Sequence, residues 1–314
     1  KINNLFNRVV VYIVNNMKIL IIQTRPGIGD LCVFLPALHE IATHESNIEA
    51  DLLTKERTCA KETLGHDPHI KNIFYLEDHN NSNLTLLRLI KKNFYEKVFI
   101  LHYGIRYPII CRLAGIKNIF SYGWFKKNEN IVEKSRQACR KWLHNKELQF
   151  PYKIYRPAVP AHKNNIVLGI GGSGPTKKWA VENFIEMINE INKIKKYNFL
   201  LAGGKIEHDV ASEIIQEIPD TAISSLCHEN INEAINLIEG SKIYIGNDTG
   251  FMHLSAGLGI PSFGLFGDTP TNYSDYTSRI YPIIPSDMTS VGHGSMAMNK
   301  ISVEHVMMKI KEII

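Results

Sequence analysis

The sequence lacks the cysteine pairs that would indicate a disulfide framework or a cysteine zinc site. Its five cysteines are far apart, odd in number and never spaced C-x-x-C: Cys32, Cys59, Cys111, Cys139 and Cys227. Such usage is typical of proteins that fold in a reducing cytoplasm. The apolar run at residues 9–14 is too short to span a bilayer, and no small-residue cleavage site of a signal peptide follows it. We therefore expect a cytoplasmic protein in which residues 1–16 form an extension outside the fold.

The chain also carries little excess charge of either sign. Lys and Arg number 36 against 31 Asp and Glu, which gives a formal net charge of +5. This balance lacks the concentrated basicity of a dedicated DNA binder, so we expect no nucleic-acid partner, but it permits a phosphate, a nucleotide or an anionic lipid. With 314 residues, of which 44% are hydrophobic, the chain is too long for one ordinary domain and suits two domains, each with its own core.

Short β-rich runs alternate with amphipathic stretches from Met17 onward. Before residue 150 the expected strands are Lys18–Gln23, Ile48–Leu53, Asn72–Leu76, Lys97–Leu101 and Asn118–Tyr122. After residue 165 they are Ile166–Ile170, Asn198–Ala202, Ala222–Ser225, Lys242–Gly246 and Ser262–Phe266. Helices between strands imply right-handed crossovers and parallel sheets. The proline-containing stretch Phe150–Asn165 reads as a linker, so we predict two doubly wound α/β domains whose ligands bind where the carboxyl ends of both sheets face one cleft.

The first candidate loop, Thr24–Asp30, joins the first strand to the first helix. Its glycines permit a tight turn, but a dinucleotide fingerprint needs a third glycine where Cys32 stands. Asp30 places a carboxylate in the first helical turn, at the mouth of the expected cleft. Its spacing alone favours a helix cap over a catalytic base, because Asp is strongly preferred at such positions.

The second loop, Gly169–Trp179, follows the first strand of the second half. It nearly spells a Walker A loop, but Pro175 occupies the position of the lysine. An anion-binding loop with Ser173, Lys177 and Lys178 remains, and a solvated loop with two surface lysines is an equally good interpretation.

The third loop, Gly246–Gly259, ends a strand and begins a helix. Asp248 or Thr249 can cap this helix, and Gly250 lies at its start. A helix N-terminus attracts a diphosphate through its free N–H groups, so we expect Asp248 to bond backbone amides rather than the ligand. His253, one turn into the helix, is a candidate phosphate contact.

Together the three loops resemble glycosyltransferase family 9, the lipopolysaccharide heptosyltransferases. The matching stretches are KILIIQTRPGIGDLCVFLPALHEI, SGPTKKWAVENF and GNDTGFMHLSAGLGIPSFGLFGDTPT, which lie in order from Met17 to about Thr271. Ala180, Phe251 and Asp268 depart from the family pattern on the donor side, so the donor sugar is less well defined by the sequence than the fold.

The resemblance implies a glycosyltransferase-B fold, with two Rossmann-like domains facing a central cleft. It assigns residues 17–155 to the acceptor-side domain, 156–300 to the nucleotide-sugar domain, and 301–314 to a helix that packs back on the first domain. It implies transfer of heptose from ADP-heptose, with inversion, to a lipopolysaccharide or lipooligosaccharide core acceptor, with no cofactor or divalent metal required. By the same resemblance Asp30 is the general base, Lys177 contacts the donor phosphates, and the donor-site residues are Ser173, Asp248, Thr249, Gly250 and His253. Glu207 aligns loosely with a ribose contact, and a solvated helix start is the preferred interpretation.

The segment from Lys126 to Lys146 carries seven basic residues against two acidic ones. With Trp124 and Phe125 just before it, one interpretation is a peripheral contact with an anionic membrane or a phosphorylated glycolipid at the cytoplasmic face of the inner membrane. A solvated helix face is the commoner explanation of such a run.

Three other functions fit the same architecture. A transferase of the family with another nucleotide sugar shares every motif. A sugar-nucleotide epimerase needs no lipid acceptor, and the Asp30 turn and the loop at Asp248 argue against it. A nucleotide-binding module without turnover is the non-enzymatic alternative, and the presence of both Asp30 and Lys177 argues against it.

Overall fold

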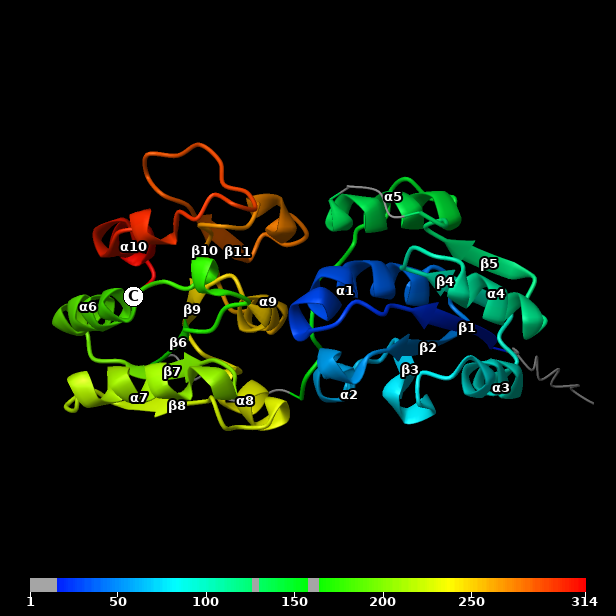
Figure 1. Cartoon of the computed structure of the whole chain (residues 1–314), viewed down its shortest axis with the longest axis horizontal. Coiled ribbons are helices and arrows are strands. Elements are labelled where there is room, and N and C mark those ends of the chain that lie inside the picture. Colours follow the sequence, from blue (N-terminus) through cyan, green and yellow to red (C-terminus); the bar gives the residue numbers. More distant parts are fainter. Residues whose placement is uncertain (1–15, 126–129, 158–163) are drawn as a thin grey trace, which may run out of the picture.

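A computed structural model describes residues 16–125, 130–157 and 164–314. It contains two parallel β-sheets, each covered by helices on both faces and set side by side along the long axis of the molecule (Figure 1). The predicted fold class of two Rossmann-like α/β domains is confirmed. The proposed extension at residues 1–16 lies outside the described residues except for Asn16.

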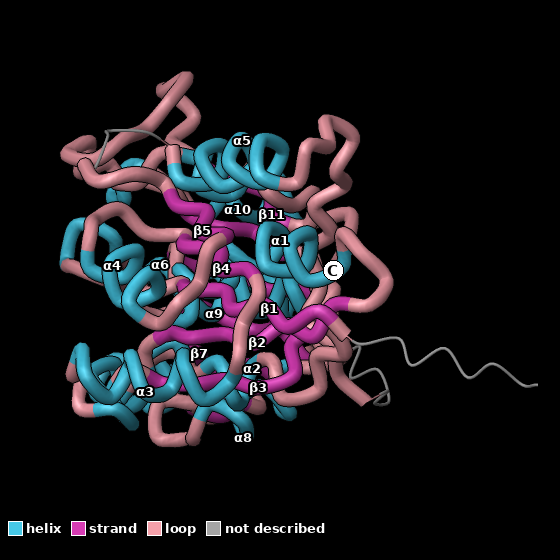
Figure 2. The backbone as a smooth tube through the Cα atoms, turned by 90° about the vertical axis from the view of Figure 1, so that its right-hand side faces the viewer, coloured by secondary structure: helices cyan, strands magenta, loops and turns pink. Residues whose placement is uncertain are grey.

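The N-terminal sheet has the strand order β3-β2-β1-β4-β5. Its strands are β1 (Met17–Ile22), β2 (Ile48–Thr54), β3 (Ile70–Tyr75), β4 (Lys97–Ile100) and β5 (Asn118–Ser121). Side chains alternate between the two faces along a strand, so Ile19 and Ile21 pack in one core while Leu20 and Ile22 pack in another. Helices α1 (Ile28–Thr43) and α5 (Ile131–Trp142) cover the first face, and α3 (Asn83–Asn93) and α4 (Arg106–Leu113) lie side by side on the second (Figure 2). The short helix α2 (Ala60–Thr63) follows β2.

The C-terminal sheet has the order β11-β10-β9-β6-β7-β8. Its strands are β6 (Asn165–Gly169), β7 (Asn198–Ala202), β8 (Ile223–Ser225), β9 (Ile243–Asn247), β10 (Ser262–Leu265) and β11 (Ile280–Ile283). Its helices are α6 (Val181–Ile194), α7 (His208–Glu217), α8 (Ile231–Ile238), α9 (Gly250–Gly257) and α10 (Val303–Ile310). The sequence did not predict β11, which contains Pro282. An edge strand tolerates proline because the missing N–H faces away from the ladder, and β11 is an edge strand.

Each half has a hydrophobic cluster of its own, as chain length led us to expect, and a third cluster runs across both halves. A single cluster includes Ile19 and Leu31 of the N-terminal half together with Tyr244 and Met252 of the C-terminal half. Helices α1 and α9 form the main contact between the halves (Figure 1).

The chain segment that connects the two halves, beginning at Phe150, packs against this contact rather than forming an exposed linker. Phe150, Tyr152 and Ile154 alternate into the core. The Tyr152 hydroxyl donates to the carbonyl of His253 at 2.5 Å, and the Ile154 amide donates to the carbonyl of Gly257 at 2.8 Å. Of the predicted linker, residues 158–163 lie outside the described part of the chain.

The last helix does not pack on the N-terminal domain, so that expectation is wrong for this chain. Val306 and Ile310 of α10 are buried in a core with Phe184 and Ile188 of α6, on the outer face of the C-terminal sheet. Residues 301–310 therefore complete the C-terminal half, because their apolar face matches that of α6.

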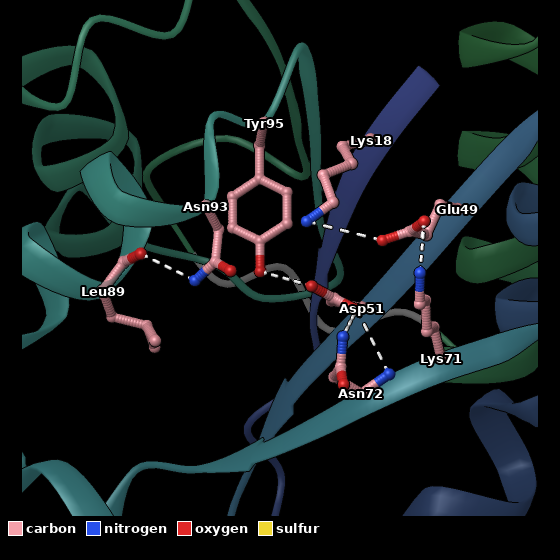
Figure 3. A network of polar contacts seen from close by, with 8 residues as sticks. All are labelled: Lys18, Glu49, Asp51, Lys71, Asn72, Leu89, Asn93 and Tyr95. Atoms are coloured by element: carbon pink, nitrogen blue, oxygen red, sulfur yellow. Dashed lines mark hydrogen bonds and ion pairs between the residues drawn. The ribbon is translucent and has the colours of Figure 1, made fainter. Parts of the chain in front are cut away.

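Buried charge at the start of the N-terminal sheet is fully satisfied (Figure 3). Asp51 of β2 accepts the Tyr95 hydroxyl at 2.7 Å and two N–H groups of Asn72 at 2.8 and 3.1 Å. Lys71 and then Lys18 lower the pKa of Glu49 beside it. These contacts join β1, β2 and β3 at the end of the sheet opposite Asp30, so they stabilise the sheet without facing the candidate site.

None of the helices in the described ranges combines the length and apolar character needed to cross a bilayer.

Candidate active site

Each sheet has a topological switch point, where strand order reverses and the carboxyl ends diverge. In open α/β sheets ligands bind outside such a point. In the N-terminal sheet it lies between β1 and β4, and the residues just beyond those strands meet there: Thr24 Oγ1 lies 3.1 Å from His102 Nδ1. In the C-terminal sheet it lies between β6 and β9, where the glycine-rich loop meets Asn247.

Asp30 lies in the first turn of α1, next to the N-terminal switch point. The helix begins after Gly27, whose φ of +100° favours glycine, and no side chain caps it. The cap role that spacing alone favoured for Asp30 is therefore wrong. Its Oδ1 instead lies 2.7 Å from Nε of Arg25, and 28% of its side chain is exposed. The carboxylate is held by one ion pair and remains open to solvent.

The start of α1 contacts the start of α9 directly. A Cβ added to Gly29 would lie 3.1 Å from Cδ2 of His253, and one added to Gly250 would lie 3.2 Å from Cβ of Ile28. Glycine at both positions allows the two helix N-termini to approach, and this approach brings the Asp30 turn beside the third candidate loop.

A polar cavity of about 570 Å³ opens at the carboxyl edge of the N-terminal sheet, and Thr24, Lys55, His102 and Arg106 are among its lining residues. Burial, and then the positive charges of Lys55, Arg25 and Arg106, lower the pKa of His102. The lining thus carries an excess of positive charge, Lys55 and Arg106 against Glu77, which suits an anionic ligand. Sequence reasoning missed these residues. A detectable signal was present for two of them, because Lys55 and His102 follow the ends of β2 and β4 closely.

Asn247 organises the C-terminal switch point. Its buried amide Nδ2 donates to the carbonyls of Ile170 and Gly171, at 3.2 and 2.8 Å, and its Oδ1 accepts the Trp179 amide at 3.0 Å. One side chain therefore fixes both ends of the glycine-rich loop to the end of β9.

The two lysines of this loop have different surroundings. Lys178 Nζ pairs with Glu207 at 2.9 Å, whereas the charge of Lys177 acts on Asp248 and Asp268. Glu207 is only 3% exposed and accepts the Gly204 amide at 2.8 Å, so it is not the solvated helix start that the sequence favoured. A Cβ on Gly171 would lie 3.5 Å from Glu207 Oε2, which places this carboxylate directly beside the loop.

Among the residues that the structure describes, Asp248 bonds side chains rather than the backbone amides that we expected. Burial by itself raises the pKa of Asp248. The hydrogen bond and charge of His253, the charge of Lys177 and the Thr269 hydroxyl together outweigh burial, so the pKa of Asp248 lies below its ordinary value. His253 Nε2 lies 3.4 Å from Asp248 Oδ1, and its Nδ1 bonds the Tyr276 hydroxyl at 2.5 Å. Both ring nitrogens therefore face protein groups.

Thr249 occupies the N-cap position of α9 without a capping side-chain bond, and its hydroxyl lies 3.3 Å from that of Tyr244. The carbonyl of Thr249 accepts the amides of Met252 and His253. For the amides of Gly250 and Phe251 no partner occurs among the described residues, so they are available to an anion. Ser173 is exposed in the glycine-rich loop.

Asp268 ties the Lys177 loop to the segment before α10. It accepts the Thr176 hydroxyl at 2.6 Å and the Met296 amide at 3.0 Å. The departure from the family pattern at this position thus has a structural role.

A further cavity, of about 1010 Å³, lies on the outer side of α6 and α7, where Glu186, Glu190 and Glu217 line it. It is at neither switch point. Within residues 16–125, 130–157 and 164–314, no group of three or more His, Cys, Asp or Glu side chains is arranged to hold a metal ion.

Comparison with known proteins agrees with the fold described above. The profile of glycosyltransferase family 9 (heptosyltransferase) matches residues 123–301. The chain is 23% identical over 343 residues to lipopolysaccharide heptosyltransferase 1 of Campylobacter coli, covering 95% of this chain and 99% of that one. Its fold matches the E. coli ADP-heptose lps heptosyltransferase II with a TM-score of 0.77 at 17% identity, over 95% and 98% of the two chains. It also matches E. coli heptosyltransferase WaaC with ADP, with a TM-score of 0.74 at 16% identity, over 95% and 100%.

Proposed function

The chain belongs to glycosyltransferase family 9, and from this membership we propose that it transfers heptose from ADP-heptose to a lipopolysaccharide or lipooligosaccharide core acceptor, with inversion. It is a glycosyltransferase, as its family is. The observation that carries the proposal is the direct contact between the Asp30 turn of one half and the N-terminus of α9 of the other.

We assign the acceptor to residues 17–155 and the donor to residues 156–300. In the N-terminal half, Asp30 accepts the proton of the acceptor hydroxyl as that oxygen attacks the anomeric carbon. General-base catalysis of this kind typically contributes about 10²–10⁴-fold to the rate. The exposure of Asp30 supports this role, because a carboxylate that is paired with Arg25 and still open to solvent can be reached by a hydroxyl. The cations lining the nearby polar cavity suit the negative charge of a core acceptor.

In the C-terminal half, the free amides of Gly250 and Phe251 and the ammonium of Lys177 offset the charge that develops on the departing diphosphate. We propose no requirement for a divalent metal. Asp248 and His253 belong to the donor site by holding this turn, since both ring nitrogens of His253 already face protein groups. We propose that Ser173 contacts the donor, since it is exposed in the glycine-rich loop, and that Glu207 beside Gly171 contacts the ribose hydroxyls.

Direct displacement from the face opposite the diphosphate inverts the anomeric centre. Because nucleotide sugars are cytoplasmic metabolites and the acceptor is a glycolipid, we propose that the reaction takes place at the cytoplasmic face of the inner membrane.

The replacement Asp30→Ala tests whether Asp30 acts as the catalytic base or only supports the structure. ADP binding, measured by titration calorimetry, should stay within about twofold of wild type, while heptose transfer falls by about 10²-fold or more. Asp78→Ala, at an exposed carboxylate paired with Lys61, is the matched control and should leave both unchanged. Equal loss of binding and transfer in Asp30→Ala would mark the residue as structural.

Donor identity needs a separate measurement. A panel of nucleotide sugars should show saturable binding of adenine nucleotides, with transfer from ADP-heptose. Selective binding of a uridine nucleotide would refute the donor assignment and favour another member of the family.

A further inference from the structure

The outer face of α3 and α4 exposes an unusual number of large apolar side chains. Of the thirteen such side chains in the described part of the chain, seven lie between residues 84 and 125. Trp124 is 68% exposed and Phe125 81%. We define the α3–α4 face by the following exposed residues: Leu84, Ile105, Ile109, Leu113, Trp124 and Phe125.

These side chains line continuous hollows. An apolar groove of about 700 Å³ lies between α4, β5 and Trp124–Phe125, and a second of about 450 Å³ lies between α3 and α4. Ile105 and Ile109 line both grooves. Exposed apolar surface of this extent, on one face, is typical of an interaction site rather than of random surface composition.

The two helices of the face carry charge of one sign, although the exposed Glu96 lies between α3 and β4. Neither α3 nor α4 contains Asp or Glu, and residues 97–125 contain none either. Exposed basic residues lie on α3, on α4 and just before β5: Arg88, Lys91, Lys92, Arg112 and Lys117. Two copies of this face would repel each other, whereas a negatively charged surface is complementary to it.

The face also adjoins the candidate active site. Ile105 lines the apolar grooves and the polar cavity that contains Lys55 and His102. An amphiphile could therefore place its polar head in the cavity at the switch point while its apolar part remains at the α3–α4 face.

The basic segment after Phe125, whose composition indicated a contact with an anionic membrane, is less suited to such a contact than the α3–α4 face. Residues 126–129 lie outside the described part. In α5, the Arg136 guanidinium donates to the Asp275 carbonyl of the other half at 2.8 Å, and the Arg140 guanidinium lies over the Phe150 ring. These charges are engaged within the protein.

We propose that the α3–α4 face docks on an anionic lipid bilayer, with Trp124 and Phe125 entering the interface and the surrounding Lys and Arg contacting acidic head groups. The proposal takes the lipid nature of the acceptor from the proposed function, but the surface itself is argued independently of the reaction. Docking in this orientation presents the polar cavity to head groups that project from the same bilayer.

The test is flotation of the full chain with vesicles of phosphatidylcholine alone or mixed with phosphatidylglycerol. We expect binding to the mixed vesicles that weakens as salt is raised, and little binding to phosphatidylcholine. Replacing Lys91 and Lys117 together by Gln should weaken binding about 25-fold, from about five-fold for each basic residue. The double replacement Trp124→Ser and Phe125→Ser should weaken it about ten-fold or more.

The matched control replaces Ile194 and Ile206, which are exposed on the C-terminal half, by Ser and should bind as wild type. Equal binding to both kinds of vesicle, unchanged binding of the variants, or self-association through Trp124 and Phe125 without vesicle binding would each overturn the proposal. Transfer to a deacylated, water-soluble acceptor should be the same in wild type and variants. Vesicle binding without heptose transfer would refute the proposed function but not the docking surface. Heptose transfer without vesicle binding would refute only the docking surface.

Discussion

Replacement of Asn247 by Ala removes the side chain that joins the glycine-rich loop to the end of β9. Asn247 is completely buried, and its three hydrogen bonds satisfy the carbonyls of Ile170 and Gly171 and the amide of Trp179. A buried polar backbone group that loses its partner costs about 1 kcal/mol or more, so three such groups predict a loss of about 3 kcal/mol. For a half of this size the loss corresponds to a fall in Tm of about 6–12 °C.

Calorimetric melting and ADP titration of the same samples test this reasoning. Asn247→Asp is the informative comparison, because it retains the acceptor for the Trp179 amide but directs a carboxylate oxygen at two carbonyls. We expect both variants to melt early and to bind ADP at least about ten-fold more weakly, since loop displacement moves Lys177. If Asn247→Ala had the Tm and the ADP affinity of wild type, the Asn247 side chain would not hold the glycine-rich loop in place as its hydrogen bonds indicate.

Two further predictions concern the same half. Gly169→Ala would place a Cβ 1.6 Å from the Tyr244 hydroxyl, so it should destabilise by about 1–3 kcal/mol or more in denaturant unfolding, whereas Gly174→Ala, with open space around it, should be nearly neutral. The Met296 amide and then the Thr176 hydroxyl lower the pKa of Asp268, and the stability this contributes is present above the ordinary Asp pKa and lost as pH falls toward the lowered value. Asp268→Asn should therefore flatten the acid side of the stability–pH curve, and an unchanged acid side would contradict it.

The alternation of strands and helices was predictable because parallel strands buried on both faces read as short apolar runs. All ten expected strands correspond to strands of the structure, within one or two residues at their ends. The strand at Ile280–Ile283 was not predictable, because Pro282 opposes a strand assignment and only its place at the sheet edge makes it tolerable. The prediction for α10 was wrong for another reason. It was taken from the family resemblance, and the helix's own amphipathic sequence specifies an apolar face but not the partner of that face.

The candidate site also has a part that could be predicted from the sequence and a part that could not. Glycines, caps and helix starts are local in sequence, so the three loops could be located from the chain alone. The partners of Asp30 and Asp248 are Arg25 and His253, each five residues away in the chain. Spacing nevertheless assigned both carboxylates to backbone roles, because residue type and position do not show which way a loop side chain turns. The long-range contacts of the site could not be assigned from the chain at all, since Tyr276 reaches His253 from a separate loop and His102 reaches Thr24 from beyond β4.

The contact between α1 and α9 has an electrostatic consequence for the donor. Both helices present their N-termini, so two positive dipole ends face each other across Gly29 and Gly250, an arrangement that is unfavourable by itself. Asp30 within the first turn of α1 and Asp248 just before α9 supply negative charge on the two sides, and each is itself held by a cation or a polar partner. An anionic diphosphate entering beside this contact would add to the same compensation, since the amides of Gly250 and Phe251 have no protein partners among the described residues. The feature that joins the two halves therefore also favours the leaving group of the proposed reaction, because one pair of helix ends carries out both tasks.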